Sequence, residues 1–380
     1  MKRNIRTLAI SALWTACGLG SSMFAQQLAI EPAQAKSFTL ATLNVDGLPG
    51  TIFFVPTNPD GPQAAGSVII SKYLADKKCD ILCLQEDFNY RWEIWSHLFA
   101  CYEHDEWSGG ILLGDESVDL AHPQNVKFGC DGLNTLWKKD IQAKNYQRIA
   151  WQRCFGKFSH ALDDMVTKGF RRHELSIPGV GEVVVYNMHM DASARRDRLR
   201  NSDTRDKEVR ISQWVQLREH ILAHLDHRPV IVAGDLNSFY HRDDIKGVFI
   251  DGIEVTGKAT VRDAWIETAN KGRYPHVGDE PIEGETFDKV LFINPTDGNT
   301  LSVCNAKIDK EGYTVCGEPL GDHYPLFVTF NMHERKTSGI QSAGVTGTGA
   351  HEVFDISGVR RTPGNLTHGV YVIDGKKVAK

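Results

Sequence analysis

Several features that the 380-residue sequence lacks narrow the classes of protein it can encode. It has no excess of basic residues: 43 lysines and arginines stand against 48 aspartates and glutamates, giving a formal net charge of −5. No overall positive field therefore points to nucleic acid, although a local basic patch is still compatible with this composition. No cysteine has the spacing to a partner histidine that a zinc site requires. With 24% charged and 41% hydrophobic residues, the chain also lacks the composition of a disordered protein.

The N-terminus has the parts of a secretory signal in their usual order. Basic residues at positions 2, 3 and 6 precede an apolar stretch at 8–19, which is too short to span a membrane comfortably, and small residues follow. We predict a signal peptide over residues 1–25, with Ala35 as a rival cleavage site. Cys17 half-matches a lipoprotein signal, but Trp14 interrupts that pattern. The expected location is secreted or on the cell surface.

The C-terminus changes character after the main body of the chain. Residues 334–350 are small, polar and glycine-rich, which predicts a flexible linker. Residues 351–380 contain short β-like runs separated by turn dipeptides. The wording "FDISGVRR" followed by "GVYVIDGKKVAK" resembles the sorting tails of secreted Bacteroidetes proteins, which implies secretion machinery as a partner. The alternative is an appended hairpin without a sorting role.

The segment "PVIVAGDLNS" predicts a buried strand that ends in two polar side chains. Its β-branched run at 229–234 leads into Asp235 and Asn237. Because side chains alternate along a strand, residues two apart project toward the same place. The alternative is an Asx turn without chemistry.

The same design recurs along the chain, and its repetition carries more weight than any one strand. Carboxylates, amides and imidazoles are the groups that metal-assisted displacement at phosphorus needs. The other predicted strands begin or end beside Asn44, Glu86, Asn187 and His189, Asp288, and Asp322 with His323.

These motifs resemble the endonuclease/exonuclease/phosphatase superfamily, which includes deoxyribonucleases, abasic-site endonucleases, inositol-polyphosphate phosphatases and neutral sphingomyelinases. "TLNVDGLP", "LCLQED", "YNMHMDA", "VAGDLNS", "FDKVLF" and "GDHYPL" occur in the order of that superfamily. The resemblance predicts a catalytic domain over residues 37–333. It implies an α/β fold in which two sheets form a sandwich with helices on the outer faces, followed here by a small β-rich C-terminal tail.

The resemblance also implies a metal site and a proton acceptor. Glu86, helped by Asn44, would bind Mg²⁺, or Mn²⁺ or another divalent cation, because hard oxygen ligands favour such ions. His323 would take a proton from the attacking water while Asp288 fixes its tautomer. Asp322 and His323 match the superfamily's terminal element, with Gly321 in place of its usual serine.

Further roles follow from the same resemblance. Asp235 and Asn237 would orient the water and the scissile phosphate, and His189 would donate to the phosphate or the leaving oxygen. Three residues could support the site or contact the substrate. They are Asp131, expected to orient His189, Lys168, for which a surface position is the alternative, and Asn187.

The substrate is a separate question from the chemistry. The signal peptide, the acidic balance and the GDGL- and KGF-like segments resemble the sphingomyelinase branch, so we expect hydrolysis of sphingomyelin at a membrane surface. The apolar segment 48–56 and Trp92 with Trp95 fit a membrane contact or packing against the core equally. The alternatives are a secreted nuclease acting on nucleic acid, a phosphoinositide phosphatase and a noncatalytic adhesin. Cys304 and Cys316 could close a hairpin by a disulfide.

Overall fold

The structure is a computed structural model that describes residues 36–335 and 353–379, with gaps at 53–54, 109–129, 157–160, 162, 194–203, 244, 363–364 and 374–375. The predicted signal peptide and most of the predicted linker lie outside the described residues. Among those described, no helix combines the length and apolar character needed to cross a membrane.

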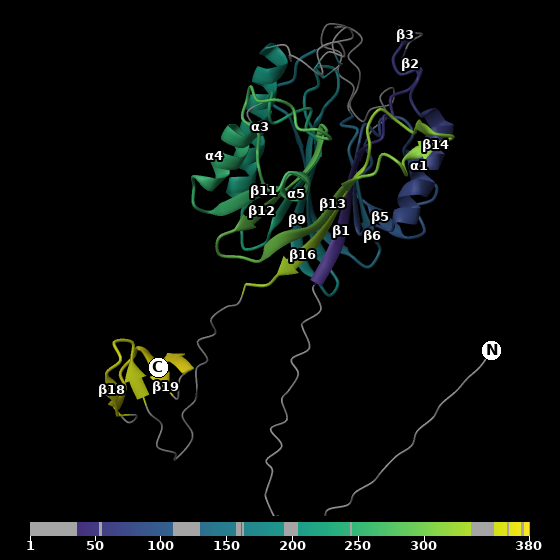
Figure 1. Cartoon of the computed structure of the whole chain (residues 1–380). Coiled ribbons are helices and arrows are strands. Elements are labelled where there is room, and N and C mark those ends of the chain that lie inside the picture. The colour runs from purple at the N-terminus through teal and green to yellow at the C-terminus, as the bar shows by residue number, and fades with distance from the viewer. Residues whose placement is uncertain are drawn as a thin grey trace, which may run out of the picture. The chain divides into compact units, whose positions relative to one another are not determined.

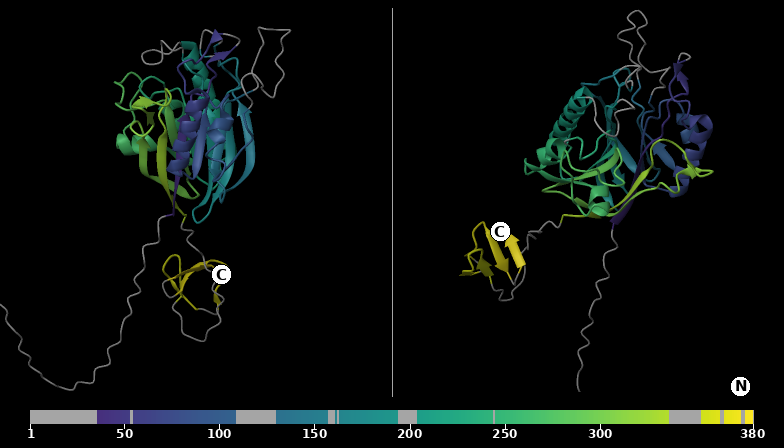
Figure 2. Two further views of the ribbon diagram at one scale, coloured as in Figure 1. Left: turned by 90° about the vertical axis from the view of Figure 1, so that its right-hand side faces the viewer. Right: turned by 45° about the horizontal axis from the view of Figure 1, so that its top comes forward.

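Two six-stranded sheets form the body of the protein (Figures 1 and 2). Strands β1 and β4 pair in parallel, as do β9 and β10, and the other neighbours are antiparallel. The first sheet has the order β13 (Thr300–Ile308), β16 (Leu326–His333), β1 (Lys36–Asn44), β4 (Ile81–Gln85), β6 (Asn134–Lys138) and β5 (Tyr102–His104). The second has the order β11 (Ala259–Asp263), β12 (Asp288–Pro295), β10 (Val230–Asp235), β9 (Gly181–His189), β8 (Gly169–Ile177) and β7 (Gln142–Ala150).

The two sheets bury their inner faces against each other. One apolar cluster combines side chains of the first sheet, such as Leu40 and Ile81, with Val185, Ile231 and Val290 of the second. Burying β-branched and aliphatic side chains on both sides of this interface removes apolar surface from water, which is the main force holding the layers together.

Helices cover the outer faces of the sandwich, as the sequence predicts. Helices α1 (Gln63–Lys77) and α2 (Arg91–Trp95) pack on the first sheet through Ile70, Leu74 and Ile94. Helix α3 (Thr204–His224) buries Trp214 and Leu217 against the second sheet. The π-helical turn η2 (Lys246–Ile250) and α4 (Asp251–Glu254) share that cluster, and α5 (Ala264–Ala269) follows β11. The predicted two-sheet α/β sandwich is confirmed.

Smaller elements complete the described chain. The apolar segment 48–56 forms a hairpin of β2 (Thr51–Ile52) and β3 (Val55–Pro56), whose Phe53 and Phe54 lie outside the described residues. A second hairpin pairs β14 (Thr314–Val315) with β15 (Glu318–Pro319). Cys304 and Cys316 are exposed free thiols, so the expected disulfide is absent between them.

The C-terminal tail forms a small antiparallel sheet, as its turn-punctuated sequence predicts. The strands are β17 (Val353–Asp355), β18 (Arg360–Arg361), β19 (Val370–Ile373) and β20 (Lys376–Ala379), in the order β18-β17-β19-β20. Val353, Tyr371 and Val378 are its buried apolar side chains.

Candidate active site

Strand register brings three of the predicted site residues together. Asp235 is the last residue of β10, whose six residues are all buried. It lies opposite His189 of the parallel neighbour β9 and opposite Asp288 of the antiparallel neighbour β12. The preceding Gly234 allows this close pairing, since its φ is 154° and a Cβ there would lie 1.9 Å from the carbonyl oxygen of Met188.

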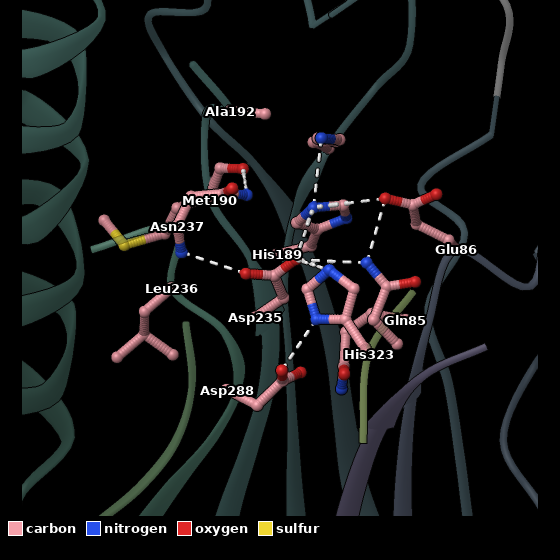
Figure 3. A network of polar contacts seen from close by, with 12 residues as sticks. Gln85, Glu86, His189, Met190, Ala192, Asp235, Leu236, Asn237, Asp288 and His323 are labelled. Carbon is pink, nitrogen blue, oxygen red and sulfur yellow. Dashed lines mark hydrogen bonds and ion pairs between the residues drawn. The ribbon is translucent and has the colours of Figure 1, made fainter. Parts of the chain in front are cut away.

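His323 and Asp288 form the hydrogen-bonded pair that the sequence predicts (Figure 3). The distance from Nδ1 of His323 to Oδ2 of Asp288 is 2.7 Å, and Nε2 of His323 lies 3.7 Å from Oδ2 of Asp235. Burial draws the pKa of His323 down, but the carboxylates of Asp288 and Asp235 together hold it well above its usual value. This arrangement leaves Nε2 facing the centre of the site.

A second group of donor atoms gathers on the other side of Asp235. Glu86, His189 and Asp235 each offer one atom, and the three atoms lie within 4.8 Å of one another. Nε2 of His189 is 3.5 Å from Oδ2 of Asp235 and 3.9 Å from Oε1 of Glu86. Two carboxylates and an imidazole fit a divalent cation. Burial raises the pKa of Glu86 because it disfavours the ionised carboxylate, and a bound cation would favour that ionised form again.

Asn44 supports this group through hydrogen bonds, and its expected contribution to metal binding stays a prediction. Its Nδ2 donates to Oε1 of Glu86 at 2.9 Å and to Oδ2 of Asp235 at 3.0 Å, and its Oδ1 accepts from the backbone N–H of Asp46. Through its amide nitrogen, Asn44 orients the two carboxylates. It also joins the first sheet to the second.

Asp46 is a site residue that the sequence reasoning missed. Burial, followed by the charges of Asp322 and Glu86, raises its pKa to about 7. Asp322, predicted as catalytic, lies beside it at the edge of the site, with Oδ1 3.9 Å from Nε2 of His323. The two acids line a pocket of about 440 Å³. In the sequence, Asp46 could have been found from its position two residues after Asn44, at the end of the first predicted strand.

Backbone geometry at two positions turns their side chains away from the regular strand direction. Glu86 has a φ of 55° and Asn237 a φ of 47°, which is unusual for residues other than glycine. The N–H groups of Gly47 and Phe88 donate to the carbonyl oxygen of Glu86 and hold its turn. Asn237 donates its backbone N–H to Asp235 and its Nδ2 to the carbonyl of Met190 (Figure 3). The Asx turn that the sequence offers as an alternative therefore occurs, and a joint role of the two polar residues stays a prediction.

Lys168 lies inside the site and is not a surface lysine. Its side chain is 5% exposed, its Nζ is 3.1 Å from Nε2 of His189, and it forms an ion pair with the fully buried Asp163. Burial lowers the pKa of Lys168, but Asp163 and Glu86 raise it further, so the ammonium stays charged. The sequence reasoning missed Asp163, because nothing local marks it as the partner of Lys168.

Two predicted supporting residues have other partners. Asp131 accepts two hydrogen bonds of 2.8 Å from the buried guanidinium of Arg171, so the expectation that it orients His189 is corrected. Asn187 is fully buried between the sheets, where it bonds to Gln85 and to the carbonyls of Leu84 and Asn134. These hydrogen bonds use its amide for packing the two sheets together and leave it no position facing substrate.

Known proteins resemble this chain in fold and, more weakly, in sequence. No family model matches the chain. An endonuclease/exonuclease/phosphatase from Bacteroides vulgatus has a TM-score of 0.51 at 15% identity, covering 78% of this chain and 99% of that one. A humanized D. rerio TDP2 has a TM-score of 0.53 at 17% identity, covering 78% of this chain and all of that one. The protein therefore has the fold of the endonuclease/exonuclease/phosphatase superfamily, as its motifs predict.

In sequence, the chain is similar to the sphingomyelinases of Mycobacterium bovis and Mycobacterium tuberculosis. The identity is 25% over 305 residues, which cover 77% of this chain and 52% of the mycobacterial proteins. The chain thus matches about half the length of these curated relatives.

Proposed function

We propose that the protein is a metal-dependent phosphodiesterase that hydrolyses sphingomyelin to ceramide and phosphocholine. The observation that carries this proposal is the placement of Asp235 between two functional groups: the His323–Asp288 pair on one side and the Glu86–His189 donors on the other. A base and a candidate cation site on either side of one carboxylate suit attack of water on a phosphodiester.

Each residue of the site has a separate role in the proposed hydrolysis. Nε2 of His323 removes a proton from water as its oxygen bonds to phosphorus. The bond to the ceramide oxygen breaks, and that oxygen takes up a proton from solvent to leave as the ceramide hydroxyl. Asp288 keeps Nδ1 protonated, so that Nε2 is the accepting atom. A divalent cation held by the carboxylates of Glu86 and Asp235 would supply Lewis-acid stabilisation of the phosphoryl oxygens, while Nε2 of His189 contacts Lys168. The ammonium of Lys168, beside His189, would stabilise the same developing charge.

Sphingomyelin is the proposed substrate because of the sequence similarity to sphingomyelinases and the net charge of −5. A nuclease gains affinity from clustered basic residues that meet the phosphates, and the overall charge offers no such field. The fold alone does not decide, since a TDP2 of this fold is known in complex with a single-stranded DNA product.

The test compares three substrates side by side. The purified chain, stripped with chelator and supplied with Mg²⁺, is assayed on sphingomyelin vesicles, phosphatidylcholine vesicles and plasmid DNA, with His323→Ala as the matched inactive control. We expect phosphocholine release from sphingomyelin that requires both Mg²⁺ and His323. Plasmid nicking without lipid turnover would assign the protein to the nucleases instead.

We also propose that the protein is exported, by the signal at 1–25 and the tail at 351–380. Fractionation of cells that produce the full chain and a chain without residues 351–380 tests this. Retention of both chains in the cytoplasm would contradict the proposal.

A further inference from the structure

Four aromatic side chains form a cluster on the outside of the first sheet. Trp92 and Trp95 come from α2, and His104 and Trp107 come from the end of β5 and the segment after it. The ring of Trp107 is 5.7 Å from Trp92 and 5.5 Å from Trp95, both edge-to-face, and it stacks on His104 at 3.9 Å. We call these four residues the aromatic platform. The side chain of Trp92 is 61% exposed, which is unusual because tryptophan is the largest residue type and is highly buried on average.

The platform is held in place from beneath. The carbonyl oxygens on either side of Trp107 both accept from arginines: Glu106 from Arg171, and Ser108 from Arg91. Arg171 is 1% exposed and is itself fixed by ion pairs to Asp105 and Asp131. A buried arginine is costly unless it is fully paired, and Arg171 is paired on both sides. The backbone that carries the half-exposed ring of Trp107 is therefore firmly held.

The platform is connected to the active site through hydrogen bonds. The backbone N–H of Ser108, next to Trp107, donates to Oδ1 of Asn134, and Nδ2 of Asn134 donates to Asp87. Asp87 directly follows Glu86. Helix α2 itself begins five residues after Glu86, with Ile94 buried on its inner side and Trp92 outside. The platform therefore lies at the end of the first sheet that carries Glu86.

We propose that the aromatic platform rests on the lipid–water interface while the active site draws in a phospholipid headgroup; this inference rests on the proposed function. Indole rings favour that interface because they combine an apolar body with a polar N–H. Single-stranded nucleic acid fits less well, since base stacking needs open ring faces and a basic surround. Here the guanidinium of Arg91 lies over the ring of Trp92 at 5.8 Å, and acidic residues, Glu93 and Glu106, accompany it in the two segments of the platform.

The experiment separates membrane binding from chemistry in the full chain. Four proteins are sedimented with vesicles of sphingomyelin and phosphatidylcholine in chelator: the parent, Trp92→Ser, Trp92→Phe and Val255→Ser. The last is the control, because it replaces an apolar side chain that is 85% exposed and lies outside the platform. The same proteins are then assayed with Mg²⁺ on the vesicles and on a soluble chromogenic phosphodiester.

We expect Trp92→Ser to bind vesicles about tenfold more weakly, the effect of losing one buried indole. Turnover of vesicle sphingomyelin by Trp92→Ser should fall with its binding, while its turnover of the soluble diester is unchanged. Trp92→Phe should retain most of the binding. Val255→Ser should match the parent. The inference is overturned if Trp92→Ser binds vesicles like the parent, loses both activities equally, or instead loses binding to a single-stranded oligonucleotide. A parent that binds vesicles without cleaving sphingomyelin would refute the proposed function and leave the binding comparison to decide the inference.

Discussion

Replacing Asp288 by asparagine tests the central pair of the site. In the parent, the carboxylate accepts the Nδ1 proton of His323 at 2.7 Å, which leaves Nε2 unprotonated and able to accept a proton from water. An asparagine in the same place can donate its amide N–H to Nδ1, which favours the tautomer with the proton on Nε2. The base is then blocked, although the shape of the site is almost unchanged.

The expected loss in kcat is about 10²–10⁴-fold, the usual contribution of a positioned general base. KM for a soluble phosphodiester should stay nearly the same, because proton transfer contributes only in the transition state. The matched control is Asp263→Asn, which changes another buried carboxylate of the same sheet whose partners are Tyr240 and the N-terminus of α5. Its kcat should remain close to that of the parent.

The pH dependence gives a second readout. Burial lowers the pKa of His323, but Asp288 and Asp235 raise it well above its usual value, so protonated His323 must lose its proton before it can act. Activity should therefore rise with pH, and removal of the Asp288 charge should move that rise to lower pH. If Asp288→Asn keeps kcat within a few-fold of the parent and the same pH profile, His323 is not the proton acceptor.

Three further predictions follow from individual contacts. Lys168→Met should lower kcat about 10²-fold, because the site loses one preorganised cation. Lys139→Met, at an exposed lysine, is the control, and equal kcat values for the two variants would exclude Lys168 from charge stabilisation. Glu86→Gln should raise the Mg²⁺ concentration needed for half-maximal activity after chelation, and an unchanged titration curve would remove it from the cation site. Burial, helped by His224, lowers the pKa of His220 to about 4; its uncharged form is favoured in the folded state. The unfolding free energy should thus fall from about pH 6.5 towards pH 4, less steeply in His220→Phe, by urea denaturation.

The sequence predicts those parts of the site that depend on strand ends. The apolar runs of β9, β10 and β12 fix the register that sets His189 and Asp288 opposite Asp235. Asn237 lies beyond the end of β10 with a φ of 47°, so strand alternation does not set its direction. A strand buried on both faces tolerates little slippage, so its polar ends are positioned reliably. The His323–Asp288 pair was implied by the family resemblance instead, because His323 lies ahead of β16 and no strand register places it.

Other parts depend on contacts between distant segments, which no local pattern encodes. Asp131 pairs with Arg171, forty residues away, because both are carried into the interior, where an unpaired charge is costly. Lys168 looks like any surface lysine in sequence until the buried Asp163 and His189 are placed around it. The orientation of the Asn44 amide follows only from the carboxylates that it meets.

Asp235 shows how the two sheets make one site. Its Oδ2 accepts from Asn44 of the first sheet and lies within 3.7 Å of the imidazole nitrogens of His189 and His323. Burial by itself would raise its pKa, but the two imidazoles and the Asn44 amide lower it to about 2. Asp235 is thus kept ionised by groups from both layers, and a shift of one sheet against the other would remove part of that support. The apolar packing between the sheets is therefore as much a requirement for the chemistry as the polar residues at the strand ends.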